Sequence, residues 1–186
     1  MRTTRTQVTL VVLLALFAAS CVHLDRVTVD ATGAQFSFDI EFEDVSYDGR
    51  FVVLKTQGAI DPLDTNTIND IYRKDTLTGD LELMSIDNAA TEATGGFDAA
   101  ISDDGDRVVF IGDSGRVVLR TVSTGTTTVV GLDDLGNEVT TNFSPDISGD
   151  GNIVAWSTTS AVVGGTSNGF GQVYRRNLTT GVVLLA

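Results

Sequence analysis

The sequence has very few of the side chains on which most catalytic sites depend. Cys21 is the only cysteine and His23 the only histidine, so no intrachain disulfide and no zinc cluster of Cys and His can form. His23 follows Cys21 by two residues and cannot easily act as a base in a folded core, which argues against Ser-His-Asp or Cys-His catalysis. No Gly-x-x-x-x-Gly-Lys segment occurs, so a P-loop is not indicated.

Proline and basic residues are also scarce. The chain has 2 prolines but 19 glycines, with many threonines and valines, a composition that favours β-structure with many turns. Its 12 Lys and Arg are outnumbered by 25 Asp and Glu, for a net charge of −13. An acidic surface repels phosphate backbones, so we expect no nucleic-acid partner. The 186 residues, 42% of them hydrophobic, are enough for one globular domain with a core.

Residues 1–20 have the features of a secretory leader. Arg2 and Arg5 form a basic start, and residues 8–19 form an apolar run interrupted only by Thr9. A helix over that run would be about 18 Å long, whereas a bilayer core is about 30 Å thick, so a permanent membrane span is disfavoured. We therefore predict a helical signal peptide over residues 1–20.

The end of this leader, residues 18–21, resembles the lipobox of a bacterial lipoprotein signal, in which small residues precede an invariant cysteine. The resemblance implies that Cys21 carries the lipid and begins the mature chain, with residues 21–25 as a tether. Several acyl chains would hold such a lipoprotein firmly at a membrane of the cell envelope, on the periplasmic side or at the surface. The alternative is a plain secretory signal, an incidental cysteine and a secreted protein.

One motif, Ser-x-Asp-Gly between two apolar stretches, occurs three times in the rest of the chain. Asp-Gly favours a tight hairpin turn because glycine adopts positive φ without a steric cost, and Ser or Asp side chains can bond the turn backbone. We interpret these residues as structural turns rather than as ligands of a metal. They are Ser46, Asp48 and Gly49, then Ser102, Asp104 and Gly105, then Ser148, Asp150 and Gly151.

The motif is part of a longer repeat. Its aspartates are separated by 56 and then 46 residues, and each copy is followed by a second pair of predicted strands joined by Thr-Gly. Four short strands at a period of this size are typical of the blades of a β-propeller. The predicted blades cover about residues 38–87, 96–133 and 142–186, with a leading strand over residues 26–30.

These units resemble the WD40-like (PD40) repeat of TolB-type bacterial β-propellers over residues 26–186. The resemblance rests on the Ser-x-Asp-Gly turn and on matching segments of the first and third copies. In the first copy the segments are Asp64-Thr65-Asn66, Asp70-Ile71-Tyr72 and Thr78-Gly79. In the third copy they are Thr166-Ser167-Asn168, Val173-Tyr174 and Thr180-Gly181. The resemblance implies an all-β fold.

Three blades are too few to close a ring, because propellers have about four to eight. We therefore expect an open, partial propeller of three four-stranded antiparallel blades. The chain is then either a fragment of a longer protein or self-associates through its open blades, since unpaired edges invite partners. The apolar residues expected in the core are Leu81, Leu83, Ile86, Val108, Phe110, Val117, Leu119, Ile153, Ala155 and Trp156.

Antiparallel blades place their connections on two opposite faces. The turn face has the tight Asp-Gly and Thr-Gly turns, and the loop face has the connections between the middle strands and between blades. Binding sites usually lie on long loops over a rigid scaffold, so we expect a protein or glycan partner on the loop face. Its loops are residues 31–35, 57–69, 88–95, 134–141 and 161–171.

The first of the long insertions is rich in oxygen ligands. Asp61, Asp64, Asn66 and Asp70 could hold Ca²⁺, which takes six to eight oxygens, or they could form a solvated loop whose side chains bond their own backbone. The third copy has Thr166 in place of Asp64, so a calcium site is not repeated. We expect no other cofactor. Most remaining aspartates fall on predicted turns, so a carboxylate pair for glycoside hydrolysis is not indicated.

These observations support a non-catalytic, lipid-tethered scaffold of the bacterial cell envelope that binds a protein or glycan. One alternative is the N-terminal propeller fragment of a larger secreted hydrolase, whose chemistry would lie beyond Ala186. A purely structural repeat segment is a third hypothesis. A fold does not by itself assign chemistry, so the choice depends on the site.

Overall fold

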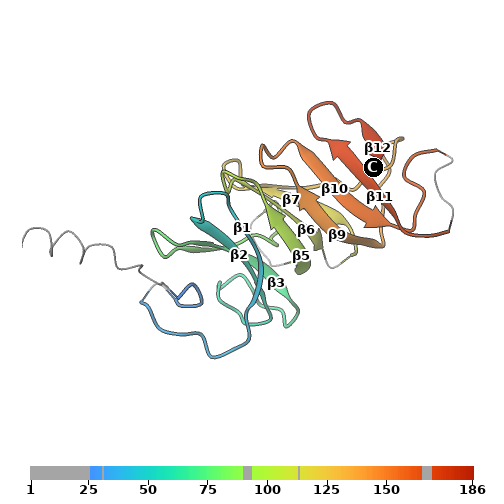
Figure 1. Ribbon diagram of the computed structural model, residues 1–186. Coiled ribbons are helices and arrows are strands. Elements are labelled where there is room, and N and C mark those ends of the chain that lie inside the picture. Colours follow the sequence, from blue (N-terminus) through green and yellow to red (C-terminus); the bar gives the residue numbers. More distant parts are fainter. Residues whose placement is uncertain (1–25, 31, 90–93, 113, 165–168) are drawn as a thin grey trace, which may run out of the picture.

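The computed structural model describes residues 26–30, 32–89, 94–112, 114–164 and 169–186 (Figure 1). The signal peptide predicted over residues 1–20, the tether over residues 21–25 and the lipid site at Cys21 lie outside the described residues. In the described part of the chain there is no helix with the length and hydropathy needed to span a bilayer.

Twelve strands form three four-stranded sheets, in which every neighbouring pair is antiparallel. No helix occurs among the described residues, which confirms the predicted all-β fold. Blade 1 is β1 (Glu41–Val45), β2 (Phe51–Thr56), β3 (Asp70–Asp75) and β4 (Leu81–Leu83). Blade 2 is β5 (Gly96–Ile101), β6 (Arg107–Gly112), β7 (Val117–Thr121) and β8 (Thr126–Val129). Blade 3 is β9 (Asn142–Ile147), β10 (Ile153–Thr158), β11 (Gln172–Asn177) and β12 (Val183–Leu185).

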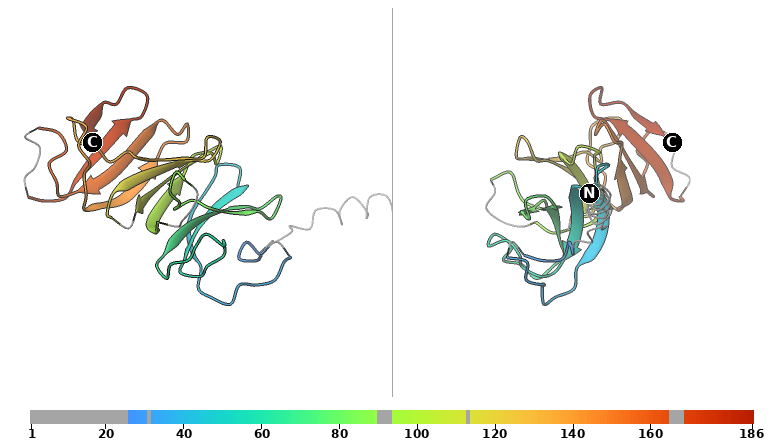
Figure 2. Two further views of the ribbon diagram at one scale, coloured as in Figure 1. Left: turned by 180° about the vertical axis from the view of Figure 1, so that it is seen from behind. Right: turned by 60° about the vertical axis from the view of Figure 1, so that its left-hand side comes forward.

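The three blades stack side by side in chain order (Figures 1 and 2). The first strand of each blade packs on the blade before it: β5 contacts β1, β2 and β3, and β9 contacts β5 and β6. Blade 1 has no blade before it and blade 3 has none after it among the described residues. The arrangement confirms an open, partial propeller of three blades.

The core lies between the blades. One cluster of buried apolar residues joins blade 1 to blade 2, and a larger one, centred on Trp156 and Tyr174, joins blade 2 to blade 3. Because blade 2 is covered on both sides, its second strand is buried on both faces, from Val108 to Ile111. A third cluster, around Tyr72, lies on the outer side of blade 1, beneath residues 57–69.

Most of the predicted core residues are buried. The exceptions are Leu81, Ile153 and Ala155, which are only half-buried. In β10 the fully buried positions are Val154 and Trp156, at 0% and 1% exposure. Side chains alternate along a strand, so Ile153 and Ala155 point to the side of blade 3 that no described blade covers.

The predicted leading strand over residues 26–30 is wrong. Only Val29 pairs, as an isolated bridge with Gln35, so the chain turns back on itself. Asp30 closes this hairpin, because its Oδ1 accepts two backbone N–H groups of the turn at 2.8 and 2.9 Å. The segment pairs with its own continuation rather than with a neighbouring strand, and the same hairpin recurs after β8, where Leu132 bridges Glu138.

Candidate binding face

The three Ser-x-Asp-Gly motifs form nearly identical turns on the turn face. In each, the serine hydroxyl donates to the aspartate at 2.9, 2.6 and 2.5 Å and accepts the first N–H of the next strand. The aspartate Oδ1 also accepts the N–H two residues later, at 3.0 Å in all three turns. The glycines have φ of 75°, 73° and 71°. The residues in question are Ser46, Asp48, Gly49, Ser102, Asp104, Gly105, Ser148, Asp150 and Gly151.

These hydrogen bonds keep the turn aspartates charged. The pKa of Asp48 is lowered by the backbone N–H of Arg50 and by the Ser46 hydroxyl. The pKa values of Asp104 and Asp150 are lowered first by the serine hydroxyl of their own turn and then by a backbone N–H. A carboxylate used in this way closes a turn and is not poised to exchange a proton near neutral pH.

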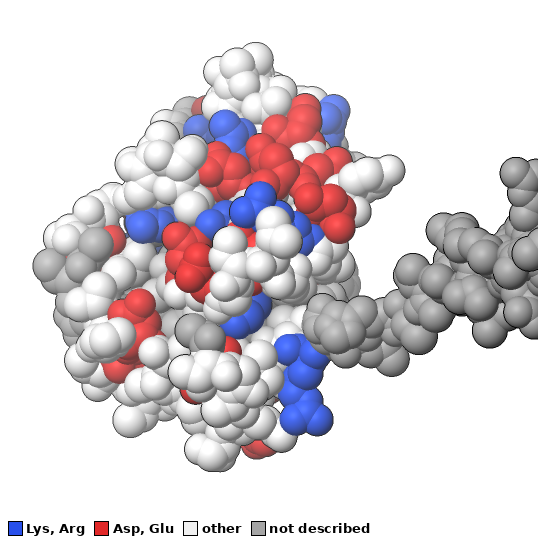
Figure 3. Space-filling model, turned by 90° about the vertical axis from the view of Figure 1, so that its left-hand side faces the viewer, with Lys and Arg blue, Asp and Glu red and all other residues white. Residues whose placement is uncertain are grey.

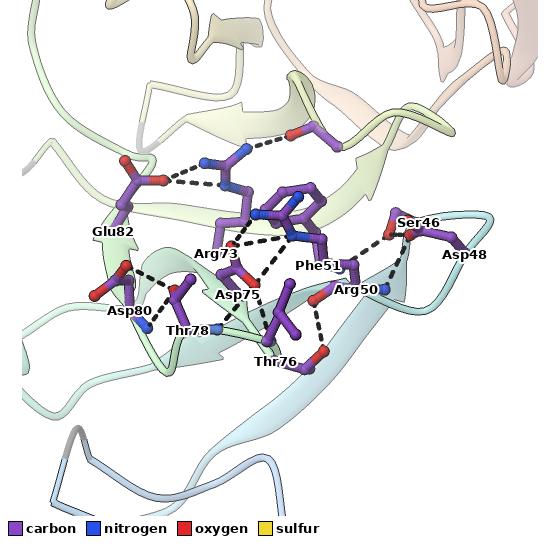
Figure 4. Close-up of polar contacts among 12 residues, drawn as sticks. Ser46, Asp48, Arg50, Phe51, Arg73, Asp75, Thr76, Thr78, Asp80 and Glu82 are labelled. Carbon is purple, nitrogen blue, oxygen red and sulfur yellow. Dashed lines mark hydrogen bonds and ion pairs between the residues drawn. The ribbon is translucent and has the colours of Figure 1, made fainter.

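A polar cluster joins the turn face of blade 1 to blade 2 (Figure 4). Arg50 binds Asp75 through Nε and Nη2, at 3.1 and 2.7 Å to Oδ2, and this hydrogen bonding lowers the pKa of Asp75 to about 2. Both Arg50 and Arg73 lie over the ring of Phe51, with the guanidinium carbons 4.7 and 4.4 Å from its centroid. Arg73 also pairs with Glu82. The cluster is a structural joint, because each of these charged groups has an opposite charge beside it.

The loop face is hollowed beside β1 and β2. A cavity of about 540 Å³ opens at the end of blade 1, lined by residues 37–39, Glu41, residues 55–58 and Asn69. Lys55 projects from β2 between two carboxylates of β1, with Nζ 2.8 Å from Glu41 and 3.2 Å from Glu43. The hydrogen bond that Lys55 donates to Glu41 raises the pKa of Lys55, so the lysine stays charged. The Glu41 side chain is 68% exposed and can meet a ligand.

Apolar groups lie beside this polar cavity. A second hollow of about 220 Å³ shares Gln57 and Asn69 with the first and also contains Ile68 and Phe97, which are 39% and 36% exposed. Phe38 lines the first cavity and stacks on Phe36, with ring centroids 5.3 Å apart. The loop face of blade 1 therefore combines exposed apolar side chains with an exposed carboxylate.

The calcium candidates already accept or donate hydrogen bonds to other groups of the protein. Asp64 accepts the hydroxyl of Tyr72 at 2.6 Å, and Asp61 accepts the N–H of Leu63 at 2.9 Å. Asp70 is fully buried and accepts bonds from Ser85, Gly95 and Asn66, and its burial raises its pKa. Across the described ranges, no group of three or more His, Cys, Asp or Glu residues is arranged to hold a metal ion.

Acidic and basic side chains are interspersed on the side of the molecule shown in Figure 3. They gather over the upper part of this view, with red and blue groups adjacent, and the lower part is mostly uncharged. Pairs such as Arg73 with Glu82 and Lys55 with Glu41 reduce the local field. A net charge of −13 thus coexists with neutralised patches.

The cavity residues of β1 and β2 were missed from the sequence. Glu41, Glu43 and Lys55 lie in predicted strands, and no motif distinguishes them. The one feature of the sequence that points to them is the charged Lys55 within an otherwise apolar strand. Of the predicted loops, residues 57–69 border both hollows, whereas residues 90–93 and 165–168 lie outside the described residues.

No family model matches the sequence, and no curated protein matches it. Among solved structures, the chain is similar to TolB from Agrobacterium tumefaciens, with 16% identity, a TM-score of 0.53 and coverage of 79% of this chain and 48% of that one. The β-propeller domain of the Trilobed protease from Pyrococcus furiosus matches with 11% identity, a TM-score of 0.53 and coverage of 79% and 41%. The tricorn protease matches with 14% identity, a TM-score of 0.51 and coverage of 84% and 14%.

These similarities define the class of protein: the chain has a β-propeller fold like that of TolB. At these identities they establish the fold alone. The chain spans about half or less of the length of each of these structures.

Proposed function

We propose that this protein is a non-catalytic, TolB-like propeller scaffold of the bacterial cell envelope that binds a protein partner through its loop face. The observation that carries the proposal is the combination of chemical groups on the loop face of blade 1. The hollow beside Glu41 and Lys55 adjoins the hollow that contains the exposed Ile68 and Phe97. On the turn face, the motif side chains bond their own turns.

The chemistry of the loop face suggests what a partner presents. Ile68 and Phe97 would receive apolar side chains, and aromatic residues are enriched at protein interfaces. The exposed carboxylate of Glu41 would receive a Lys or Arg, because Lys55 leaves it only partly neutralised. A net charge of −13 would speed the approach of a basic partner. A glycan stacked on Phe38 is the alternative ligand.

The experiment compares two matched substitutions of exposed apolar residues. Ile68→Ser alters the loop face and Leu77→Ser alters the turn face, where Leu77 is 77% exposed. Immobilised wild-type protein and both variants are incubated with an envelope extract and, separately, with a glycan array. We expect a protein captured by the wild type and by Leu77→Ser, and captured at least about 10-fold less by Ile68→Ser.

Equal capture by all three proteins would move the site away from these loops. Binding only on the glycan array would replace the protein partner with a glycan. Absence of any specific ligand would favour a purely structural repeat.

The proposed location in the cell envelope rests on the predicted signal peptide over residues 1–20 and on Cys21. The resemblance of this peptide to a lipoprotein signal supports an anchor at Cys21, and plain secretion is the alternative. Metabolic labelling with a radioactive fatty acid should label the wild type and not Cys21→Ser. A wild-type protein that is secreted without label would exclude the anchor.

A second candidate function is the propeller part of a larger secreted hydrolase. The specific observation in its favour is that two of the similar structures are proteases, matched over only 14% and 41% of their length. An immunoblot of the native cells distinguishes the two candidates. A band somewhat below 19.7 kDa, the mass of the chain before residues 1–20 are removed, supports the scaffold, and a much larger band supports the hydrolase.

A further inference from the structure

A cavity of about 250 Å³ opens at the second joint, where blade 2 packs on blade 3. Arg107 begins β6 directly after its Ser-x-Asp-Gly turn, so the cavity lies towards the turn face. None of the described residues that line it is an Asp or a Glu, although the chain carries a net charge of −13. The lining includes two arginines, a threonine and several apolar residues: Arg107, Arg176, Thr128, Leu119, Val129 and Leu178.

The first joint, where blade 1 packs on blade 2, has an acid at the corresponding place. Arg73 donates from Nε and Nη2 to Glu82, and from Nη1 to the carbonyl oxygen of Gly105 at 2.5 Å (Figure 4). Burial lowers the pKa of Arg120 in blade 2, and the negative charges of Glu82 and Asp87 oppose that lowering. Arginines from both blades are thus neutralised by carboxylates of blade 1.

The second joint has a hydroxyl in place of this acid. Glu82 lies opposite Arg73 in blade 1, and the same register places Thr128 opposite Leu119 in blade 2. Thr128 lines the cavity, so the position at which the first joint has its carboxylate borders open space in the second.

The other acid of the first joint is also replaced in function. Asp133 has the place in blade 2 that Asp87 has in blade 1. It closes its own hairpin, because its Oδ1 accepts the N–H of Leu135 at 2.9 Å and that of Asn137 at 2.7 Å. The carboxylates of blade 2 therefore do not neutralise the arginines of the cavity.

Arg107 has donors to spare. Its Nη1 donates to the carbonyl oxygen of Gly151 at 2.6 Å, as Arg73 Nη1 does to the corresponding glycine of blade 2. Its Nε and Nη2, the two atoms with which Arg73 binds an acid, have no hydrogen-bond partner among the described residues. Asp104 and Asp150 lie near enough for its charge to lower their pKa values, but the serine hydroxyls of their own turns have the larger effect.

Arg176 has no hydrogen bond or ion pair in the part of the chain that the structure describes, and its Nη1 is buried. The basic residues at the same place in the other blades each bind the Thr-Gly turn of their own blade. Lys74 Nζ donates to the carbonyl oxygen of Gly79 at 2.6 Å. Arg120 Nη1 donates to that of Gly125 at 2.9 Å. A guanidinium without an acceptor is a group that an external anion would satisfy.

We propose that the cavity between blades 2 and 3 binds a ligand in which a carboxylate is joined to an apolar group. The carboxylate takes the place that Glu82 has in the first joint and accepts hydrogen bonds from Arg107 and Arg176. Leu119 and Leu178 contact the apolar group. A free carboxylic acid and the C-terminus of a peptide that ends in an apolar residue share this chemistry. The site is independent of the proposed loop-face partner.

Isothermal titration calorimetry on the full chain in detergent, at low ionic strength, tests the site. The probe is N-acetylleucine, which joins a carboxylate to a branched apolar group, and we expect a dissociation constant of about 1 mM. N-acetylleucine amide has the same apolar group without the charge and should bind at least about 10-fold more weakly. The peptide N-acetyl-Gly-Gly-Leu distinguishes the two sources. It should bind more tightly than N-acetylleucine if the site takes peptides, and no more tightly if the site takes free acids.

Two neighbouring arginines of β11 provide a matched pair of variants. Arg176→Gln removes a guanidinium that lines the cavity and should raise the dissociation constant for N-acetylleucine at least about 10-fold. Arg175 points to the opposite side of blade 3, because side chains alternate along a strand. Arg175→Gln removes the same charge and should leave the dissociation constant unchanged. Fluorescence of Trp156, which is buried in the core between blades 2 and 3, checks that both variants are folded.

A substitution at Thr128 tests the comparison of the two joints. Thr128→Glu supplies the acid that blade 1 has in Glu82, so it should occupy the arginines from within the chain. We expect it to weaken the binding of N-acetylleucine at least about 10-fold and to raise the melting temperature by about 2–4 °C, the effect of one added ion pair. Thr128→Gln has nearly the same shape without the charge and should not raise the melting temperature.

Any of four results would overturn the proposal. One is a wild type that does not bind N-acetylleucine. Another is equally tight binding of its amide or of inorganic phosphate, which would exclude recognition of a carboxylate on an apolar group. The third is equal weakening by Arg176→Gln and Arg175→Gln, which would indicate a general effect of charge. The fourth is a Thr128→Glu variant that binds the probe as tightly as the wild type does.

Discussion

At the scale of single residues, the turn glycines show how one motif acquires different energetic roles. Gly49 and Gly105 have the same position in the motif and nearly the same φ, 75° and 73°. A Cβ on Gly49 would meet nothing within 4 Å, whereas a Cβ on Gly105 would lie 2.1 Å from the ring of Phe51. Gly49 serves only the turn, and Gly105 serves the turn and the blade joint.

Alanine at these two glycines should separate the two roles. Gly49→Ala should lower the free energy of unfolding by about 1–2 kcal/mol, the cost of a left-handed conformation for a residue with a Cβ. Gly105→Ala should lower the free energy of unfolding by about 1–3 kcal/mol more than Gly49→Ala does, because the added methyl group would clash with the ring of Phe51. Urea denaturation followed by circular dichroism measures both. Equal losses in the two variants would show that the joint tolerates the methyl group.

At the scale of elements, residues 57–69 form a loop that also covers the outer apolar cluster of blade 1. From the sequence they were expected to be a polar, ligand-facing insertion. In the structure Ile60 and Leu63 pack over the outer cluster of blade 1, and Asp64 accepts the buried hydroxyl of Tyr72. A sheet that packs on a neighbouring blade through one face still has apolar side chains to cover on its other face. The sequence alone does not show which loop covers them.

A double-mutant cycle on Asp64 and Tyr72 tests this cover. Tyr72 is 0% exposed and Asp64 5%, and Asp64 Oδ1 already lacks a hydrogen-bond partner. Tyr72→Phe should destabilise the protein by about 1–3 kcal/mol, because it leaves the other carboxylate oxygen unsatisfied as well. Asp64→Leu combined with Tyr72→Phe should recover much of that loss, since no unsatisfied carboxylate oxygen remains at position 64. Additive losses in urea denaturation would exclude coupling between the two side chains.

A calcium titration tests whether residues 57–69 also bind a metal ion. The candidate ligands Asp61, Asp64, Asn66 and Asp70 are bonded to neighbouring groups, and calcium takes six to eight oxygens. We expect the melting temperature of the wild type to be unchanged by millimolar Ca²⁺. A rise in the wild type that is absent in Asp64→Leu would instead establish a site in this loop.

At the scale of the whole molecule, acid should destabilise the fold. The Arg50 guanidinium lowers the pKa of Asp75 from 3.8 to about 2, and internal hydrogen bonds lower those of the three turn aspartates. A carboxylate whose pKa is lower in the folded state stabilises the fold above its unfolded pKa. That stabilisation disappears as the pH falls toward the folded pKa.

The melting temperature should therefore fall between about pH 4 and pH 2. Asp75→Asn should melt earlier at pH 6 and lose less on acidification, because it lacks the titrating partner of Arg50. Asp80→Asn, which affects a carboxylate that accepts the Thr78 hydroxyl in the same turn, serves as the control. Parallel pH profiles for the wild type and Asp75→Asn, measured by differential scanning calorimetry, would contradict this account.

The sequence by itself determined the repeat, the all-β class and the position of every Ser-x-Asp-Gly turn. These features depend on contacts between residues close in the chain, such as Ser46 with Asp48 and with the N–H of Phe51. Only the tertiary structure decided which glycine abuts an aromatic ring, that residues 57–69 cover blade 1, and that blade 2 is covered on both sides. Those outcomes depend on contacts between residues far apart in the sequence, such as Phe51 with Gly105 and Arg107 with Gly151. Local turn chemistry cannot specify such contacts, because they form only when whole blades pack together.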